Sequence, residues 1–326
     1  MTVRKTVVSL LLTGLAAPAF ADEAAVRRIA DFMEAKMRLF VLAVIALLVA
    51  TGANAGVALT HVHGLSYSGD GKKLMIPNHH GLAVYEGGKW SKAPGPQHDY
   101  MGYAATAKHL YSSGHPAPGS GLVNPFGLIR SKDGGKTWEK LGLEGETDFH
   151  LLATGWNTNA IYVWNPAPSS RMKRAGLHYT LNEGFAWKPA GAKGLEGDPH
   201  ALGVHPDDAG NVAVATSKGI FESTDSGESF QKIAGGEGAS VFYDLDGKHL
   251  WYGSFDGRPR LARARQRGGP VTQIELPALR DDAVAYIAQN PAKRAEYSIA
   301  TFGRSVFLSR DAGRTWTPIA EGGQGK

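Results

Sequence analysis

The sequence predicts an all-β protein, a β-propeller built from four-stranded antiparallel blades. Three observations support this fold class. Glycine supplies 42 of the 326 residues, which indicates many tight turns. An eight-residue motif occurs four times, and repeats of about 40 to 50 residues are typical of solenoids and propellers. Alternating apolar and polar runs separate the copies, as expected for strands with one buried face.

The composition narrows the class of protein before any motif is considered. The chain is 43% hydrophobic and 20% charged, which excludes wholesale disorder and allows a large core. It has no cysteine, which excludes a disulfide scaffold, a thiolate metal site and a cysteine nucleophile. The formal net charge of +5 is too small and too scattered to favour nucleic-acid binding.

The first 55 residues are expected to be an export signal region with two signal-like segments. In residues 1–21, a basic start and an apolar run end at the small-x-small pattern Ala19-Phe20-Ala21. In residues 37–55, the run 39–50 has 12 residues and ends at Ala53-Asn54-Ala55. That run is shorter than the roughly 17 residues that a membrane-spanning helix needs. The preferred interpretation is translation from Met37, and the rival is cleavage after Ala21 with the second run as a membrane tether. Both predict a periplasmic or secreted body, residues 56–326, folded as one propeller.

The repeated octet has the pattern S/T-x-D/N-x-G-x-x-W/F. Its first residues are separated by 49, 43 and 86 residues, and 86 is twice 43. A degenerate copy is therefore expected near residue 266, and another lies at 86–90. Six blades follow, with seven as the alternative. The four clear copies begin at Ser131, Thr180, Ser223 and Ser309.

This octet resembles the Asp-box, or BNR repeat, of sialidases, sortilin-type receptors and related β-propellers. The resemblance covers roughly residues 60–320 and implies the same fold. Physical chemistry agrees with it, because Asp and Gly can shape a hairpin turn whose carboxylate accepts backbone N–H groups. The aromatic residue would pack between sheets. These aspartates are therefore expected to fix turns rather than to perform chemistry.

Polar residues come into register when the units are aligned on their first strands, which line the channel of a propeller. Five of six strand starts carry His or Asp two residues before an apolar position. The second strand runs antiparallel and returns to the same end, which adds His79 and His115. The octets follow the third strand and lie at the opposite end. The channel mouth is thus expected to gather His63, His79, His115, His150 and His200 with Asp99, Asp148, Asp198 and Asp282, flanked by His61.

Three hypotheses explain this cluster. The first is a polar channel mouth whose side chains cap strand ends. The second is a transition-metal site, with Cu or Zn the metals considered, because imidazole and carboxylate groups suit such ions. His61 and His63 lie on one side of a strand and form a plausible ligand pair. The metal candidates are His61, His63, His79, His115, His150 and His200.

The third hypothesis is hydrolysis by two carboxylates. Its candidate catalytic residues are Asp99, Asp148, Asp198 and Asp282, with Tyr100 or Tyr103 assisting. The stretches at His61, His98 and Ser113-Gly114-His115 resemble those of secreted bacterial proteins labelled glycosyl hydrolases. However, no arginine occurs from Gly56 to Ile129, so the arginine triad that a sialidase needs is not evident. A glycosidase activity would rest on analogy of fold alone.

A basic stretch is the other departure from background, and it comprises Arg258, Arg260, Arg263, Arg265 and Arg267. A solvated outer strand is the favoured interpretation, and a site for a polyanion is the alternative. We therefore expect an exported propeller that binds a metal ion, a small molecule or a glycan at the channel mouth. The alternatives are a glycoside hydrolase and a scaffold with a protein partner. Nucleic acid is not an expected partner, and a membrane is expected only through an uncleaved N-terminal segment.

Overall fold

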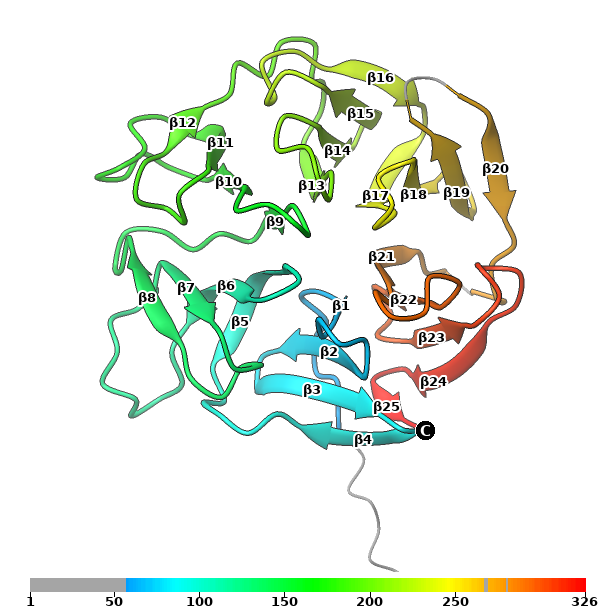
Figure 1. Ribbon diagram of the computed structural model, residues 1–326, viewed down its shortest axis with the longest axis horizontal. Helices are drawn as coiled ribbons and strands as arrows, with labels where there is room; N and C mark the ends of the chain where they lie inside the picture. The colour runs from blue at the N-terminus through cyan, green and yellow to red at the C-terminus, as the bar shows by residue number, and fades with distance from the viewer. Residues whose placement is uncertain (1–56, 267–268, 280) are drawn as a thin grey trace, which may run out of the picture. The chain divides into compact units, whose positions relative to one another are not determined.

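In the computed structural model, six β-sheets stand around a central axis like the blades of a propeller (Figure 1). The structure describes residues 57–326 except 267, 268 and 280. Every strand pair within a sheet is antiparallel, and the described residues contain no helix. The predictions of an all-β fold, of six blades and of four-stranded antiparallel sheets are confirmed. The predicted export signals lie outside the described residues, and the boundary at residue 56 stays a prediction.

The blades follow one another in chain order. The first three blades contain β1 (Ser66–Tyr67), β2 (Lys73–Asn78), β3 (Gly81–Glu86) and β4 (Lys89–Lys92); β5 (Asp99–Ala105), β6 (Leu110–His115), β7 (Leu128–Ser131) and β8 (Glu139–Gly142); and β9 (Leu152–Thr154), β10 (Ile161–Asn165), β11 (Gly176–Thr180) and β12 (Lys188–Pro189).

The last three blades repeat this arrangement with one addition. They contain β13 (Pro199–Val204), β14 (Val212–Thr216), β15 (Gly219–Ser223) and β16 (Gln231–Ala234); β17 (Glu237–Tyr243), β18 (His249–Phe255), β19 (Pro259–Arg265) and β20 (Val271–Ile274); and β21 (Val284–Gln289), β22 (Tyr297–Thr301), β23 (Val306–Ser309), β24 (Thr317–Glu321) and β25 (Gln324–Gly325).

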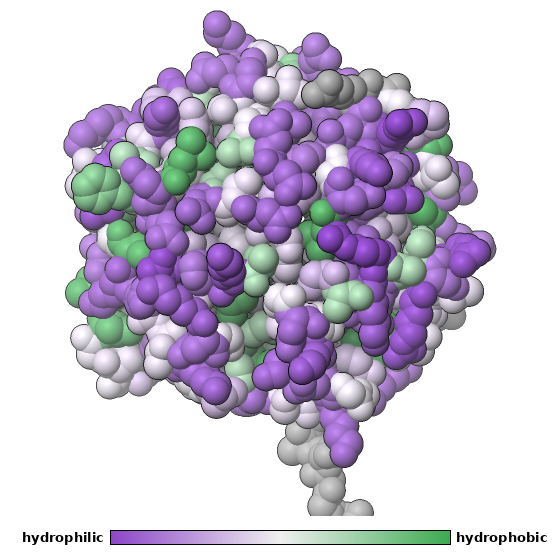
Figure 2. Space-filling model, in the orientation of Figure 1, coloured by the Kyte–Doolittle hydropathy of each residue, from purple (hydrophilic) through white to green (hydrophobic). Residues whose placement is uncertain are grey.

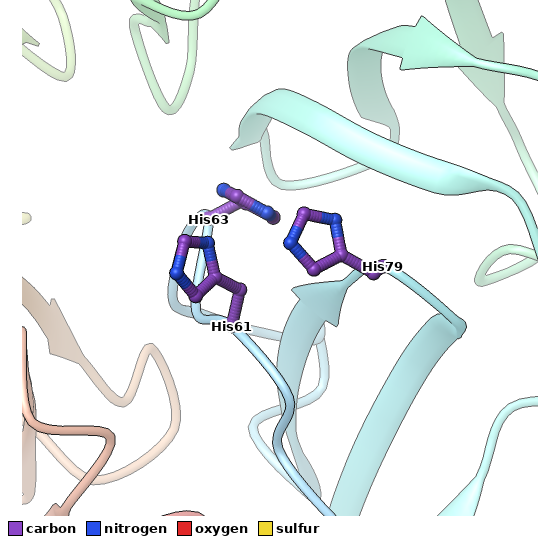
Figure 3. A group of neighbouring side chains, drawn as sticks. All are labelled: His61, His63 and His79. Carbon is purple, nitrogen blue, oxygen red and sulfur yellow. The ribbon is translucent and has the colours of Figure 1, made fainter.

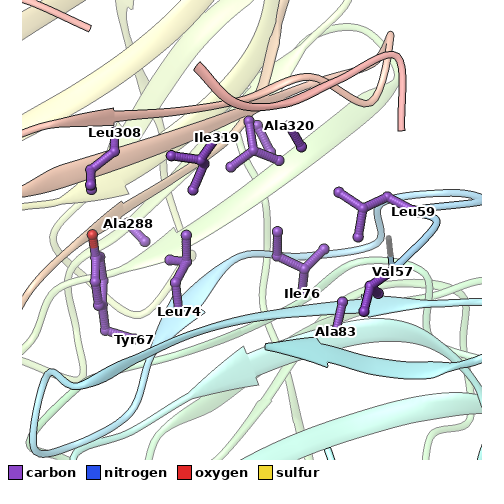
Figure 4. Close-up of a cluster of buried hydrophobic side chains, with 12 residues drawn as sticks. Val57, Leu59, Tyr67, Leu74, Ile76, Ala83, Ala288, Leu308, Ile319 and Ala320 are labelled. Carbon is purple, nitrogen blue, oxygen red and sulfur yellow. The ribbon is translucent and has the colours of Figure 1, made fainter. Parts of the chain in front are cut away.

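The core lies between neighbouring blades. One cluster joins the first and last blades, where Leu74 and Ile76 of β2 pack beside Leu308 and Ile319 (Figure 4). These side chains are at most 5% exposed, so each sheet buries apolar surface on its neighbour. Hydrophilic residues cover most of the face seen in Figure 2, and hydrophobic ones occur there in small separate groups.

Ring closure, which the sequence left open, uses both ends of the described chain. Strand β25 extends the last blade, and Ala58 forms an antiparallel bridge to Gln324 of that strand. The Leu59 amide donates to the carbonyl of Gly323 at 2.7 Å. The ring is thus closed by main-chain hydrogen bonds between residues far apart in the sequence. Among the described residues, no helix is long and apolar enough to cross a membrane.

The octets fold as the sequence predicts. In the copy that begins at Ser131, the Ser131 hydroxyl accepts the amide of Gly135 at 2.8 Å. Asp133 accepts both the amide and the hydroxyl of Thr137, at 2.9 and 2.6 Å. The copies that begin at Ser223 and Ser309 repeat these contacts, so the octet side chains hold a turn. The strands on either side of the two degenerate positions are also antiparallel pairs, β3 with β4 and β19 with β20.

Candidate functional site

The channel mouth is the end of the ring at which the innermost strands begin. The register of β5 and β6 pairs Asp99 with His115, so the start of a first strand and the end of a second strand do lie together. Beneath the mouth, a cavity of about 160 Å³ is lined by apolar residues of the innermost strands, including Leu152, Leu202 and Val241. Among the mouth histidines, His63, His150 and His200 contribute to its lining.

Three histidines of the first blade form one cluster at this mouth (Figure 3). His61 and His63 come from the segment before β1, and His79 follows β2 in the turn to β3. Each ring offers one nitrogen atom, and these atoms all lie within 4.8 Å of one another. The ring centroids are 5.2 Å apart for His61 and His63 and 4.8 Å apart for the other two pairs.

Asp99, from the start of the second blade, orients this cluster. Its Oδ2 lies 2.8 Å from Nδ1 of His79, so a proton on Nδ1 leaves Nε2 of His79 with a free lone pair. Its Oδ1 lies 3.8 Å from Nε2 of His63. Within the described part of the chain, Oδ1 of Asp99 and Nε2 of His63 are both buried without a hydrogen-bond partner. Buried polar atoms are usually paired, so this gap is a place where a ligand atom or cation would be stabilised.

Burial lowers the pKa of His63 from 6.5 to about 4. The carboxylate of Asp99 opposes this shift, and the charges of His79, His61 and His150 add to it. At neutral pH the His63 ring is therefore uncharged, which is the form that binds metals. Three imidazole nitrogens with a carboxylate behind one of them match the chemistry of a transition-metal site, in which an outer carboxylate fixes the tautomer of a ligand.

A second group of predicted residues meets at the next seam between blades. Oδ2 of Asp148 lies 3.1 Å from Nε2 of His115 and 2.7 Å from Nε2 of His150. Nδ1 of His115 lies 2.7 Å from Oδ1 of Asn124. The hydrogen bond to Asp148 raises the pKa of His150 above 6.5; burial opposes this rise, and the charges of Asp148 and Asp99 support it.

The other predicted mouth residues stand apart from these two groups. Nδ1 of His200 lies 2.8 Å from the carbonyl oxygen of Gly238, and Asp198 is exposed. Asp282 accepts the amides of Ala283 and Gly303 through Oδ1, at 2.8 and 2.9 Å, so it holds a turn.

The four candidate carboxylates of the hydrolysis hypothesis therefore have different surroundings, and that hypothesis stays a prediction. The assisting tyrosines are both buried. The hydroxyl of Tyr100 donates to the carbonyl of Pro96, and that of Tyr103 bonds to Ser66. Burial raises the pKa of each. These contacts favour a structural role for both tyrosines.

A buried carboxylate that no sequence motif indicates, Asp244, follows β17. Its oxygens accept Nε1 of Trp251 and the hydroxyl of Tyr297, each at 2.7 Å, and Nε of Arg263 at 2.9 Å. His249 lies 3.5 Å away. Asp244 forms a potential metal group with Asp246 and His249, but these donors already occupy its carboxylate, so we assign it a structural role.

The arginines of the basic stretch have different surroundings. Arg263 differs from the expected solvated residue, because it forms an ion pair with Asp244. Arg258 and Arg265 are exposed, and Arg260 pairs with Asp256 at 3.2 Å. Arg267 lies outside the described residues.

Comparisons with known proteins define the class. No family model and no curated protein matches the sequence. Among solved structures, the chain is similar to the GH74 enzyme of Niastella koreensis, with 18% identity and a TM-score of 0.55, over 81% of this chain and 46% of that one.

Two further solved structures are similar. An extracellular domain of a one-component system from B. thetaiotaomicron shares 14% identity at a TM-score of 0.51, over 83% of this chain and 34% of that one. A chain of a nidogen/laminin complex shares 12% identity at a TM-score of 0.54, over 75% of this chain and 91% of that one. The chain spans about half the length, or less, of the first two. At these identities the likeness establishes the fold, and this protein is a six-bladed β-propeller.

Proposed function

We propose that this propeller is an exported protein that binds a first-row transition-metal ion, Cu or Zn, through His61, His63 and His79. The observation that carries the proposal is the convergence of three imidazole nitrogens within 4.8 Å of one another. Such a set suits both metals. Three protein ligands also leave a coordination position for water or a small molecule, as in catalytic rather than closed structural sites.

Two features of the surroundings support binding of a cation. The unpartnered Oδ1 of Asp99 and Nε2 of His63 are both acceptors when His63 is neutral with its proton on Nδ1, so a cation bound to the ring would also be attracted by the nearby carboxylate. The bond from His79 to Asp99 would hold the ring with Nε2 toward its neighbours. His61 is exposed whereas His63 and His79 are half-buried, so the site is open to solvent on one side.

The decisive experiment compares two adjacent histidines. Protein expressed without a His tag is stripped with a chelator and titrated with Cu²⁺ or Zn²⁺ in a calorimeter. We expect one stoichiometric binding event that His79→Ala removes. His80→Ala is the matched control, because its exposed side chain lies next to His79 and outside the cluster. Equal binding by wild type and His79→Ala, or no binding by wild type, would overturn the proposal.

Export is part of the same proposal and rests on the two signal-like segments of residues 1–55. The chain has no cysteine, so neither its fold nor the proposed site depends on the redox state of a thiol. Fractionation of cells and N-terminal sequencing of the mature chain test this point. Recovery of the full-length chain in the cytoplasm would contradict it.

A further inference from the structure

The cavity beneath the channel mouth has an apolar wall that the blades leave uncovered. Leu65, Leu202, Phe242 and Tyr286 line this cavity. Each of these side chains is only half-buried, although it lies on or next to the innermost strand of a blade. Covering apolar surface stabilises by about 25 cal/mol per Å², so a ligand with an apolar body would gain free energy by entering the cavity.

The size of the cavity suits a single aromatic ring. Its volume is about 160 Å³, and an engineered apolar cavity of about 150 Å³ is known to bind benzene. Phe242 and Tyr286 supply aromatic rings to the wall from two adjacent blades. Aromatic rings pair favourably in offset or edge-to-face arrangements, so this wall favours an aromatic ligand over an aliphatic one.

The hydroxyl of Tyr286 is a hydrogen-bond donor available to such a ligand. Three other tyrosines line the cavity, and each hydroxyl is bonded to a side chain at 2.7–2.9 Å: Tyr67 to Ser298, Tyr103 to Ser66 and Tyr243 to Glu222. Burial alone raises the pKa of Tyr286 to about 12, and neither a hydrogen bond nor a charge contributes to the shift. At neutral pH this hydroxyl is therefore protonated, and it has no partner among the described residues.

The charge of the wall excludes an ionic ligand. Among the described residues, the lining contains no Asp, Glu, Lys or Arg, and its titratable groups other than tyrosine are His63, His150 and His200 at the mouth end. A charged ligand deep in this cavity would lose its hydration without gaining an opposite charge, which is costly. The ligand is therefore expected to be neutral.

We propose that the channel cavity binds a neutral molecule with one aromatic ring and a small oxygen substituent, a simple phenol, whose oxygen accepts a hydrogen bond from Tyr286. The ring would cover the apolar wall formed by Leu65, Leu202 and Phe242. A site of this kind combines apolar walls with a few placed polar groups. It goes beyond the proposed metal site and does not require a metal ion.

The test uses two ligands that differ by one hydroxyl, fluorobenzene and 4-fluorophenol. Each is titrated into chelator-treated full-length protein, and binding is followed by ¹⁹F nuclear magnetic resonance. For ligands of this size we expect dissociation constants of about 0.1–1 mM. Tyr286→Phe should weaken binding of 4-fluorophenol about three- to tenfold, because one hydrogen bond is lost. The same substitution should leave fluorobenzene within about twofold.

Filling the cavity should abolish binding of both ligands. Leu202→Trp and Ala104→Phe add bulk to the wall from two different blades, and thermal unfolding shows whether each variant is folded. Leu181→Trp is the matched control, because Leu181 is exposed and does not line the cavity. It should bind both ligands as the wild type does.

The outcomes separate this inference from the proposed metal site. No binding by wild type, or binding that both filling variants retain, would overturn the cavity as a ligand site. An unchanged affinity of 4-fluorophenol in Tyr286→Phe would overturn the role of the hydroxyl and with it the preference for phenols. His79→Ala, which removes a proposed metal ligand, should bind both ligands like the wild type. Failure of metal binding therefore leaves this inference standing, and failure of phenol binding leaves the metal site standing.

Discussion

Replacing Asp99 by Asn tests whether this carboxylate prepares the metal site proposed for His61, His63 and His79. The substitution keeps the shape of the side chain and removes its charge. In the native chain, Oδ2 of Asp99 accepts Nδ1–H of His79 at 2.8 Å, and Oδ1 lies 3.8 Å from Nε2 of His63. An amide can still accept the proton of His79 through its oxygen. Its NH₂ group then faces Nε2 of His63, where it can donate to the lone pair that the metal requires.

The size of the effect follows from the hydrogen bond that changes. A hydrogen bond to a charged group contributes about 1.5–3 kcal/mol and a neutral one about 0.5–1.5 kcal/mol. The difference, about 1–2 kcal/mol, corresponds to a dissociation constant weaker by about 5- to 30-fold. This agrees with the 10- to 100-fold typical of losing an outer-sphere partner of a metal ligand, about 1.4–2.7 kcal/mol. Protonation of His63 adds nothing at pH 7, because its pKa is about 4 and removal of the Asp99 charge lowers it further.

Competitive titration against a chromophoric chelator measures the change at pH 7. Asp198→Asn is the matched control, since it removes the same charge from an exposed residue of the same end of the ring. We expect Asp99→Asn to weaken the binding of Cu²⁺ or Zn²⁺ by His61, His63 and His79 by the stated factor and Asp198→Asn to leave it within about twofold. An unchanged affinity in Asp99→Asn, or an equal loss in both variants, would refute the argument that Asp99 acts through His79.

Two further predictions concern stability. Asp244→Leu leaves the buried donors around that position unpaired and should lower the free energy of unfolding by about 3–5 kcal/mol in urea denaturation. The control is Arg260→Ala, which removes an exposed ion pair and should lower that free energy by less than about 1 kcal/mol. Similar values for the two variants would contradict the structural role of Asp244. Hydrogen bonds from Ser229 are the main cause that lowers the pKa of Asp225 from 3.8 to about 2. The ionised Asp225 therefore stabilises the folded protein fully above pH 3.8, and this stabilisation is lost as the pH falls through about 2. Asp225→Ala should therefore destabilise the protein by about 1–2 kcal/mol at pH 7, with the difference from wild type disappearing near pH 2; a difference independent of pH would argue against the ionised turn.

The sequence was sufficient for the architecture because the repeat is local and periodic. Each octet carries its own turn, and Asp133 with Thr137 can be recognised without any knowledge of the ring. Counting along the second strands placed His79 and His115 at the end where the first strands begin, and the register of Asp99 with His115 bears this out. Closure by β25 and Ala58 had no such signal, because those short segments fall outside the period.

The composition of the site was harder to predict, because it depends on which side chains face one another across a seam. His63, His150 and His200 all lie at or just before the start of the innermost strand of a blade, yet only the first two lie beside other histidines of the mouth. The second strand of the third blade ends at Asn165 and supplies no histidine for His200. Asp244 had no motif to reveal it, since its partners come from three different strands.

The octet turns and the proposed metal site lie at opposite ends of the ring, and their carboxylates differ in how far they are already hydrogen-bonded. The octets follow the third strand of a blade, and their carboxylates are occupied by amides and hydroxyls of the same turn. The mouth residues lie where the first strand of a blade begins and where the second strand ends. Among them, Asp99 and Asp148 each retain one buried oxygen without a hydrogen-bond partner in the described structure. Because a propeller is held by packing between blades, a mouth carboxylate can stay unsatisfied at a local cost while the octets fix the turns. Substitutions at the mouth should therefore change metal binding with little effect on unfolding, and substitutions in the octets should do the reverse.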